Sequence, residues 1–525
     1  MPIFFNGTIL TQDPAHANPE AVWFQNDRIR GVGALSELRQ AAGEQEPLLD
    51  LHGRCLLPGF VEAHIHVWKV GNLRTHLLDV RGVRDIPELQ TKLRAYAEAH
   101  PNATWIQARG FNEAAMTERR MPTRHDLDEA IPDRPVMVQR TCAHISVLNT
   151  SGLAHAGISR HTVPPLGGEI HHDEQGEPNG ILLETAQGLG FKATPPFSTE
   201  HYEDMIAAAG EVLLENGFTT ATDPGVLPDL LAVYRNLDTA NQLPIRFNVM
   251  PIRLPDGGTE PLPLTEPHES DHLVINTVKF FADGGLSGKT SAVSRPYRNT
   301  DETGVLRLPA DFFYTLAHEP HQRGWKIATH AIGDVAIEGV LQTYERLYHE
   351  FPSPARHRIE HLGLPNADQL ARIAALHISA VPQPMFIREL GMNFRRYLDD
   401  EFLAGCYPMR AMLRAGIKVA FSSDAPVVRS FSALVNLHAA YNRTDAQGEV
   451  IAPDESVSIQ DGLYAHTMGG AIANGMEDRI GSITVGKFAD FVILDQSPLA
   501  VPPEEVASLH VMETWLGGIQ RFARS

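Results

Sequence analysis

The sequence predicts an α/β protein built around a parallel (β/α)8 barrel that carries smaller additions. Eight short apolar segments in the middle of the chain have the length and composition of strands. Segments with apolar residues at about 3.6-residue spacing, such as 203–217 and 367–377, lie between them and predict helices. At 525 residues the chain is long for one simple domain, so the barrel is expected to carry further segments.

Residues 1–57 predict short strands that form the first part of a small β domain. The stretches "IFFNGTIL" and "AVWFQNDRIRGVG" are typical of hairpins, with a turn at Asn26-Asp27. Residues 476–525 have a similar pattern, and "GSITVGKFADFVILD" places Gly486 between two strand-like runs. The two ends could form separate caps, or they could pair into one sheet domain. We expect the second arrangement because chain termini often lie close together.

Residues 58–475 predict the barrel itself. Its eight expected strands cover 59–67, 217–225, 244–252, 273–281, 325–331, 356–362, 378–384 and 417–425. The gap between the first two strands, about 68–205, is too long for a loop. We therefore expect an inserted subdomain after the first barrel strand.

Charge and composition argue against several classes of protein. The formal net charge of −20 disfavours nucleic acid or an anionic membrane as the main partner. The cysteines, Cys55, Cys142 and Cys406, form no spaced set, so neither a disulfide framework nor a cysteine zinc site is expected. The N-terminus lacks the basic start of a signal peptide, and no apolar stretch approaches about 18 residues. We expect a cytoplasmic protein without a membrane span.

Two histidines end the first expected strand. His64 and His66 lie one residue apart in "GFVEAHIHVW", so both point to the same face of that strand. Barrel active sites are built at the carboxyl ends of the strands, and imidazole is a good ligand for zinc and similar ions. Taken alone, such a pair could also be packed or surface histidines.

Three further candidates end later strands. His330 follows "WKIAT", His361 follows "RHRIE", and Asp424 follows "VAFSS". Each has a structural alternative: His330 could cap a helix, His361 could pair with a nearby carboxylate, and Asp424 could be an N-cap. At the same end of successive strands, however, four histidines and one carboxylate form a ligand set that accidental placement explains poorly.

Lys279 lies near the end of the fourth expected strand, among apolar residues. An uncompensated ammonium is costly in such surroundings. The structural alternative is a lysine paired with Asp283. The functional alternative is a neutral amine that reacts with carbon dioxide, because the resulting carbamate is an anion able to bridge two metal ions.

These motifs together resemble the amidohydrolase superfamily, specifically amidohydrolase family 3. The resemblance rests on "LLPGFVEAHIHV", "VKFFADGG", "ATHAIGDVAIEGVL", "RIEHLGL", "FSSDAPV" and the terminal "GSITVGKFADFVILD", in this order. Two stretches of the insert, "RTCAHISVLNTSGLAHAGI" and "GEPNGILLETA", are also similar to the family. The resemblance implies a distorted (β/α)8 TIM barrel, a small β-sandwich from both termini and a metal-dependent hydrolase.

The resemblance also assigns roles to the strand-end residues. His64, His66 and Asp424 are expected to bind the more buried metal, and His330 and His361 the second, with Lys279 as a carboxylated bridge. A site with one metal would leave Lys279 a substrate-binding or structural role. Zinc is the first expectation, and His and carboxylate ligands also accept Fe, Mn, Co or Ni.

The implied reaction is hydrolysis of a C–N amide-type bond in a small N-acyl or N-formyl amide, with an apolar or aromatic group. A metal-bound hydroxide would attack the carbonyl, and Asp424 would move the proton from the water to the leaving amine. The expected substrate-binding residues are His144, Asp283, Trp68 and Gln383.

Several alternatives stay open at this point. A cyclic amide, a carbamate or a phosphoester could use the same site, and deamination of an aromatic amidine is a further reaction. A metal-binding or ligand-binding relative without turnover is the alternative from another class. The resemblance also implies that the protein could form a homodimer.

Overall fold

The computed structural model describes residues 2–43, 45–113, 116–141, 145–165, 168–184, 186–255 and 260–524. The chain divides into two compact units, one of Met1–Val67 with Gly210–Ser525 and one of Trp68–Ala209. In the part of the chain that is described, no helix is both long and apolar enough to cross a lipid bilayer.

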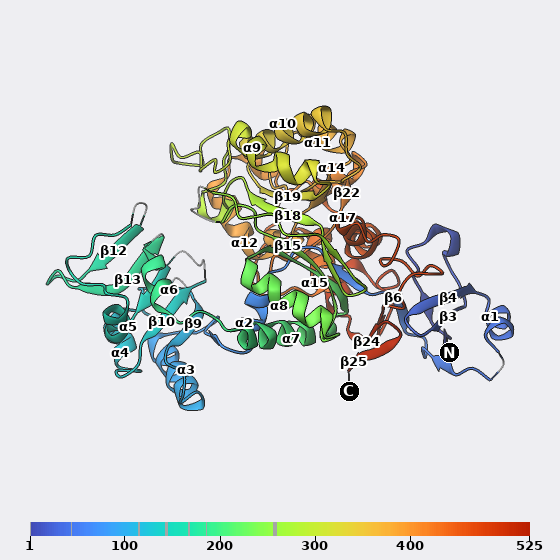
Figure 1. Ribbon diagram of the computed structural model, residues 1–525, viewed down its shortest axis with the longest axis horizontal. Coiled ribbons are helices and arrows are strands. Elements are labelled where there is room, and N and C mark those ends of the chain that lie inside the picture. The colour runs from blue at the N-terminus through green and yellow to red at the C-terminus, as the bar shows by residue number, and fades with distance from the viewer. Residues whose placement is uncertain are drawn as a thin grey trace. The chain divides into compact units, whose positions relative to one another are not determined.

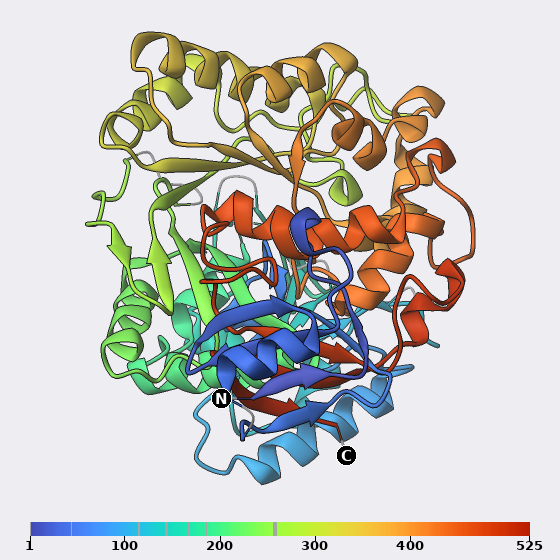
Figure 2. The ribbon, with the colours of Figure 1, turned by 90° about the vertical axis from the view of Figure 1, so that its right-hand side faces the viewer.

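The chain ends form two small sheets of the first unit, one from N-terminal strands and one from strands of both ends. Figure 2 shows the N-terminal strands in blue and the C-terminal strands in red. One sheet has the order β4-β3-β1-β5, from Arg28–Gly33, Ala21–Gln25, Ile3–Phe5 and Leu48–Asp50. The other has the order β2-β6-β23-β24-β25, from Thr8–Ile9, Cys55–Pro58, Phe491–Leu494, Val511–Leu516 and Ile519–Ala523. β3 and β4 pair antiparallel around the turn at Asn26-Asp27, so the predicted hairpin in 21–33 is confirmed. The hairpin predicted for "IFFNGTIL" is wrong, because β1 and β2 pair with different neighbours and belong to different sheets.

An aromatic cluster joins these two sheets. The ring centroids of Phe4 and Phe24 lie 5.3 Å apart, and Trp515 lies 5.2 Å from Phe4 at a nearly perpendicular angle. Phe491 of β23 contacts both phenylalanines. Edge-to-face and offset rings of this kind add to the stabilisation from apolar burial. The core of the terminal sheets therefore contains side chains from both ends of the chain.

The rest of the first unit holds two largely parallel sheets. The order in one is β16-β17-β15-β14-β7, from His268–Glu269, Leu273–Ile275, Arg246–Pro251, Phe218–Val226 and Phe60–Glu62. The order in the other is β18-β19-β20-β21-β22, from Thr277–Phe281, Lys326–Ala331, Arg358–His361, Ser379–Val381 and Lys418–Val419. Among the described strands of these two sheets, only β16 runs antiparallel to its neighbour. Each of the eight expected strand segments contains an observed strand.

One expected strand is divided between the two sheets. Residues 273–281 form β17, which pairs with β15, and β18, which pairs with β19, with Asn276 between them. The apolar run is continuous on both sides of this residue, so its pattern predicted a single strand. Near the C-terminus, the expected strand pair around Gly486 is reduced to β23, because residues 484–487 form a turn.

Two sets of backbone contacts link the two parallel sheets. Ile252, just after β15, forms a parallel bridge with Lys279 of β18. At the other edge, the amide of Asp424 donates to the carbonyl of His64 over 2.8 Å, and the amide of His66 donates to Ala425 over 2.9 Å. The segments that carry the candidate ligands are thus tied together by their own backbones.

Helices alternate with these strands. Figure 1 shows α9, α10 and α11 on one side of β18 and β19, and α9 and α10 pack against β19. The α-helices that follow the strands are α7 Thr199–Glu215, α8 Pro228–Thr239, α9 Ala310–Gln322, α10 Asp334–Glu350, α11 Ala367–Ala375, α12 Pro384–Tyr397, α13 Asp400–Ala404, α14 Met409–Arg414, α15 Ala433–Asn442, α16 Ile459–Tyr464 and α17 Gly470–Asn474. α1 Leu35–Ala42 covers the N-terminal sheet through Leu38. The predicted helices at 203–217 and 367–377 correspond to α7 and α11.

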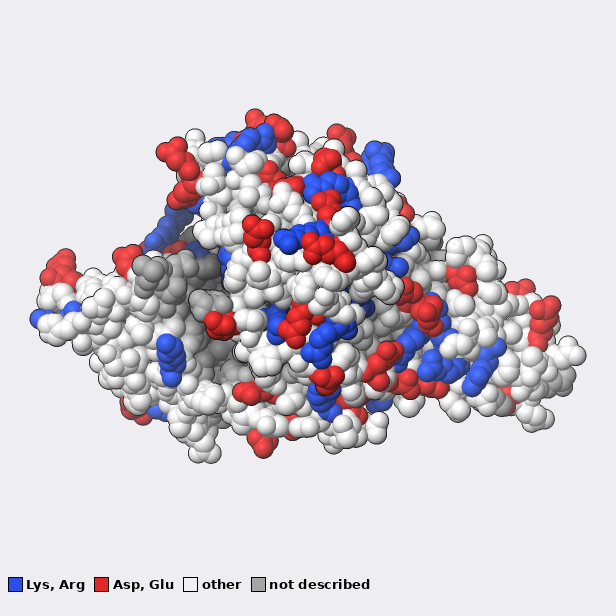
Figure 3. Space-filling view, turned by 45° about the horizontal axis from the view of Figure 1, so that its top comes forward, with Lys and Arg blue, Asp and Glu red and all other residues white. Residues whose placement is uncertain are grey.

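Charges of both signs are interspersed on the face that Figure 3 displays. Ion pairs between neighbouring helices are part of this mixture. Arg372 of α11, for example, contacts Glu338 and Glu345 of α10 at 2.8 and 2.7 Å.

The second unit is built on one sheet of order β12-β13-β11-β10-β9-β8. Its strands are Gly168–His172, Pro178–Glu184, Ile145–Leu148, Val136–Arg140, Ile106–Phe111 and Leu78–Asp79. The helices are α2 Val67–Asn72, α3 Ile86–Ala99, α4 Arg124–Asp128, α5 Thr150–His155 and α6 Gln187–Ala193. Two apolar clusters contain side chains of this sheet, one with α3 and one with α5 and α6.

Candidate metal centre

Three candidate ligands meet where the strands end. His64, His361 and Asp424 are buried, and one ligand atom from each lies within 4.8 Å of the others. Asp424 Oδ1 is 3.4 Å from Nε2 of His64 and 3.3 Å from Nε2 of His66. The ring centroid of His330 lies 4.4 Å from that of His361. The structure therefore brings all four candidate histidines and the carboxylate into one group.

The tautomer of His64 follows from its contact with Glu360. Nδ1 of His64 lies within hydrogen-bond distance of Glu360 Oε2, and both side chains are buried. A carboxylate only accepts, so Nδ1 carries the proton. The Nε2 lone pair of His64 then faces Asp424.

The tautomer of His361 is set in the same way by Gln383. The amide nitrogen of Gln383 donates to the carbonyl of Val381 and to the hydroxyl of Ser422, over 2.8 and 2.9 Å. Its Oε1 therefore accepts from Nδ1 of His361, over 2.7 Å. Nε2 of His361 is left with a lone pair.

His330 presents its other ring nitrogen. Its Nε2 donates to the carbonyl of Gly284 over 3.0 Å and lies 3.3 Å from Asp283 Oδ1. Two acceptors beside Nε2 place the proton there, so Nδ1 is the nitrogen that can act as a ligand.

Lys279 lies in β18, fully buried, and its Nζ has no hydrogen-bond partner among the residues that the structure describes. Burial lowers the pKa of Lys279 to about 8, although the carboxylates of Glu360 and Asp424 act in the opposite direction. A substantial fraction of this amine is therefore neutral in mildly alkaline solution.

The charge states of the other groups suit a cation. Burial lowers the pKa of His64, and it lowers the pKa of His361 well below the ordinary value. Burial alone would raise the pKa of Asp424, but His66 and His64 hold it below its ordinary value. These directions favour neutral imidazoles at His64 and His361 and an ionised carboxylate at Asp424, which are the forms that ligate a cation.

This donor set fits a divalent metal ion. Lone pairs of His64, His361 and Asp424 point at one another at short distance, and Asp424 Oδ1 has no hydrogen-bond donor among the described residues. Such an arrangement is unfavourable unless a cation lies between the lone pairs. Imidazole and carboxylate are the ligands that zinc and its neighbours accept.

The backbone is strained at two of these residues. His361 has φ of 73° and Asp424 has φ of 60°, in the left-handed region that disfavours side chains. Strain of this kind is stored at functional sites. At His361 it also breaks the alternation of β20, so that Glu360 and His361 both reach the same group.

The expected substrate-binding residues have varied surroundings. The carboxylate of Asp283 accepts from the amides of Ala292, Ile332 and Gly333, over 2.8–3.0 Å. Gln383 lies behind His361, with both ends of its amide bonded as described above. Trp68 is the first residue of the second unit, where its ring contacts Phe197 and Tyr202. His144 lies outside the described residues. A substrate role for each of these four stays a prediction.

Sequence reasoning missed the charged residues behind the ligands. Glu62 accepts from the amides of His64 and Ser423, over 3.2 and 3.0 Å, and burial raises its pKa to about 8. Arg358 and Glu360 form a fully buried ion pair on β20. Opposite charges two residues apart in an apolar strand were the available signal, because such residues share one face.

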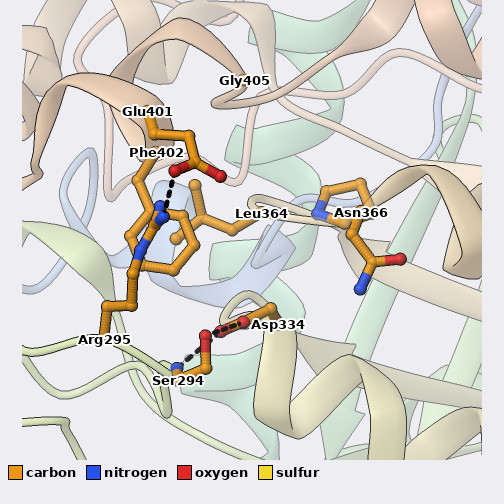
Figure 4. A pocket seen from close by; sticks show the side chains of 9 residues that line it. Ser294, Arg295, Asp334, Leu364, Asn366, Glu401, Phe402 and Gly405 are labelled. Carbon is orange, nitrogen blue, oxygen red and sulfur yellow. Dashed lines mark hydrogen bonds and ion pairs between the residues drawn. The ribbon is translucent and has the colours of Figure 1, made fainter.

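A separate pocket of about 210 Å³ lies over the loops after β19 and β20, and Figure 4 shows it from close by. Its charged groups have partners within the lining: Arg295 pairs with Glu401, and Asp334 accepts from the hydroxyl of Ser294. None of the candidate metal ligands lines this pocket.

Comparison with known proteins finds relatives along nearly the whole chain. The protein-family model described as "Amidohydrolase family" matches residues 48–522 of the sequence. The Bacillus subtilis (strain 168) protein named "Putative amidohydrolase YtcJ" is 28% identical over 527 residues and 98% of both chains. N-substituted formamide deformylase of Arthrobacter pascens is 27% identical over 543 residues, 100% of this chain and 98% of its own. An uncharacterized metal-dependent hydrolase from Pyrococcus furiosus superposes with a TM-score of 0.78 at 26% identity, over 95% of this chain and 99% of that one.

Proposed function

Because this chain belongs to the amidohydrolase family, we propose that it hydrolyses the C–N bond of a small N-formyl or N-acyl amide that carries an apolar or aromatic group. The observation that carries this proposal is the convergence of ligand lone pairs from His64, His361 and Asp424. The name of the relative from Arthrobacter pascens supports the substrate class. We also propose that the two parallel sheets form a distorted (β/α)8 barrel, with the site at the carboxyl ends of its strands.

The ligand set divides into two groups. His64, His66 and Asp424 would hold one divalent ion, with zinc as the first candidate, and His330 and His361 a second. A metal ion held there supplies a water of lowered pKa and polarises a carbonyl. The protein's own contribution is to fix each ring, through Glu360, Gln383 and Gly284.

Lys279 would carry a carbamate between the two groups. The neutral amine attacks carbon dioxide, a C–N bond forms, and one proton leaves to solvent. The product is an anion at a position where an ammonium would otherwise be a cation. Its charge is close enough to interact with His64, His361 and Asp424. Burial favours this reaction because it keeps part of the amine neutral.

Asp424 would transfer the proton. As the water oxygen bonds to the carbonyl carbon, Oδ1 accepts a proton from that water, and it then protonates the leaving nitrogen as the C–N bond breaks. The two products are a carboxylic acid and an amine.

Elemental analysis tests the first step of this proposal. Protein purified without chelator or affinity metal is expected to contain about two equivalents of divalent metal. About one equivalent would remove the bridging role of Lys279 and leave the hydrolase proposal in place. No metal, before or after reconstitution, would contradict the catalytic proposal.

A substrate screen tests the reaction itself. The loaded enzyme is expected to release amine from N-formyl and N-acyl derivatives of aliphatic or aromatic amines, measured with an amine-reactive dye. Hydrolysis of a phosphotriester without turnover of any amide, cyclic amide or carbamate would assign the site to another reaction.

A further inference from the structure

A buried polar row lies behind His64, and we define it as Glu360, Arg358 and Asn474. The guanidinium of Arg358 donates to Glu360 through Nε over 2.5 Å and through Nη2 over 3.0 Å. The same Glu360 carboxylate accepts from Nδ1 of His64. All three members of the row are completely buried.

Asn474 anchors the far end of the row. Its Oδ1 accepts from Arg358 Nη1 over 2.9 Å, and also from Thr222 and Asn248 over 3.1 and 2.9 Å. These partners belong to β20, β14 and β15. Asn474 itself ends α17, so a helix near the C-terminus fixes Arg358, the partner of the carboxylate that contacts His64.

The two halves of the metal centre differ in the side chain that accepts a hydrogen bond from the ligand histidine. Behind His64 is a carboxylate, that of Glu360, which accepts two N–H groups from the buried guanidinium of Arg358. Behind His361 is the neutral amide of Gln383. A carboxylate partner makes an imidazole a stronger electron donor and fixes its ring more firmly than an amide does.

We propose that the polar row makes the His64 half of the metal centre the tighter-binding half, with Glu360 as a positioning residue that Arg358 and Asn474 hold in place. This inference rests on the proposed function, because it needs a metal at His64. Removal of the carboxylate charge should then weaken the most tightly bound metal selectively.

A buried ion pair of this kind needs an explanation other than stability. Two apolar side chains of similar volume are often as stabilising as a buried pair, because desolvation offsets much of the Coulomb attraction. The Arg358–Glu360 pair has a use that such a replacement would lack, since it presents one carboxylate oxygen to His64.

The test measures metal affinity rather than activity. Metal-free wild type and the Glu360→Gln variant are titrated with zinc against a competing chelator, after circular dichroism has shown that both are folded. Glutamine keeps the shape and one acceptor but loses the charge. The first binding constant is expected to fall about 10–100-fold, and the weaker constant, where a second metal binds, much less.

Asp490→Asn is the matched control. Asp490 forms another buried pair of the same geometry, with Arg246, at 2.7 and 3.0 Å. It contacts none of the candidate ligands. This variant is expected to lose stability as Glu360→Gln does and to keep the wild-type metal affinity.

The outcomes separate the two proposals. If the wild type binds no metal, the proposed function fails, and the inference fails with it. If the wild type binds metal and Glu360→Gln binds it equally well, only the inference fails. Should Glu360→Gln not fold, Asn474→Ser serves as the test: Asn474 is three contacts from His64, through Arg358 and Glu360, and an unchanged metal affinity would overturn the role of the row.

Discussion

Asp424 combines the properties that a proton-transfer group needs at this site. It is buried, yet the neighbouring histidines keep its pKa below the ordinary value, so the carboxylate is ionised. Its Oδ1 faces the imidazole nitrogens of His64 and His66 at 3.4 and 3.3 Å. It can therefore ligate a metal and still accept a proton from a water held there.

Replacement of Asp424 by asparagine tests this double task. The amide has nearly the same shape but cannot shuttle a proton, so kcat is expected to fall about 10²–10⁴-fold. The rate is measured with the best amide found in the screen, and metal content is measured in parallel. Asp445→Asn is the control, because Asp445 is a buried carboxylate paired with Arg395 at 2.7 Å. A rate near that of the wild type in Asp424→Asn would exclude the assignment.

The strand-end residues could be predicted from the sequence, but their partners could not. A histidine or aspartate after an apolar run is visible as a pattern, and its position in the strand predicts which end of the sheet it reaches. Glu360 contacts His64 from almost 300 positions away, and Asn474 meets Arg358 more than 100 positions away. No spacing rule covers such pairs, and the left-handed backbone of His361 breaks the alternation on which the prediction depended.

At the scale of elements, a pair of buried histidines that is distinct from the candidate ligands, His321 and His357, fixes the start of β20. The amide of Ile327 donates to Nδ1 of His357 over 3.2 Å, so Nε2 of His357 carries the proton and donates to Nδ1 of His321 over 2.9 Å. Nε2 of His321 then donates to the carbonyl of Phe351 over 2.7 Å. Both rings are buried, and this arrangement joins α9 to β20.

The histidine pair predicts a loss of stability in acid. Burial lowers the pKa of His357 well below 6.5, so below about pH 6.5 the unfolded chain binds a proton that the folded chain does not. The unfolding free energy therefore falls as the pH falls, by up to about 1.4 kcal/mol per pH unit for this residue.

Melting temperatures between pH 7.5 and 5 test this expectation. His357→Phe is expected to be less stable than the wild type at pH 7.5, because it leaves His321 without its donor, and to lose less stability on acidification. His52→Gln, at an exposed position, is expected to keep the wild-type slope. Equal slopes in wild type and His357→Phe would contradict the account.

The sequence predicted the type and order of the helices and strands better than it predicted which strands pair with each other. Apolar segments and helical periodicity predicted the alternation of strands and helices, because both patterns are local. The division of residues 273–281 between two sheets was not predictable, since β17 (LVI) and β18 (TVKFF) lie one residue apart in one strand-like run and are separated only by the neighbour that each one pairs with.

At the scale of the whole molecule, the terminal sheets depend on aromatic contacts between the first and the last residues of the chain. Phe4 is 2% exposed and contacts Phe24, Phe491 and Trp515. Phe4→Ala is expected to destabilise the protein by about 3–5 kcal/mol, because it leaves a cavity in this cluster.

Thermal unfolding and an activity assay at 25 °C measure the effect of Phe4→Ala. The melting temperature should fall by several degrees, while kcat for an amide substrate should stay unchanged, because Phe4 contacts none of the candidate ligands. Phe312→Ala is the matched control: Phe312 is 40% exposed, so its loss should change stability by less than about 0.5 kcal/mol. A melting temperature equal to that of the control would show that the cluster does not hold the ends together.

The pairing of β6 with β23 has a consequence for how the protein is made. Leu57 of β6 pairs with Val492, which the ribosome adds roughly 430 residues later. At about 5–20 residues per second, this takes on the order of 20–90 seconds. During that interval the apolar side chains of Cys55–Pro58, all buried in the finished protein, have only the short strand β2 beside them and are accessible to chaperones and proteases. A chain whose synthesis stops before residue 491 lacks β23 and leaves these side chains exposed. Exposed apolar residues at β6 therefore distinguish an unfinished chain from one in which β23 has formed.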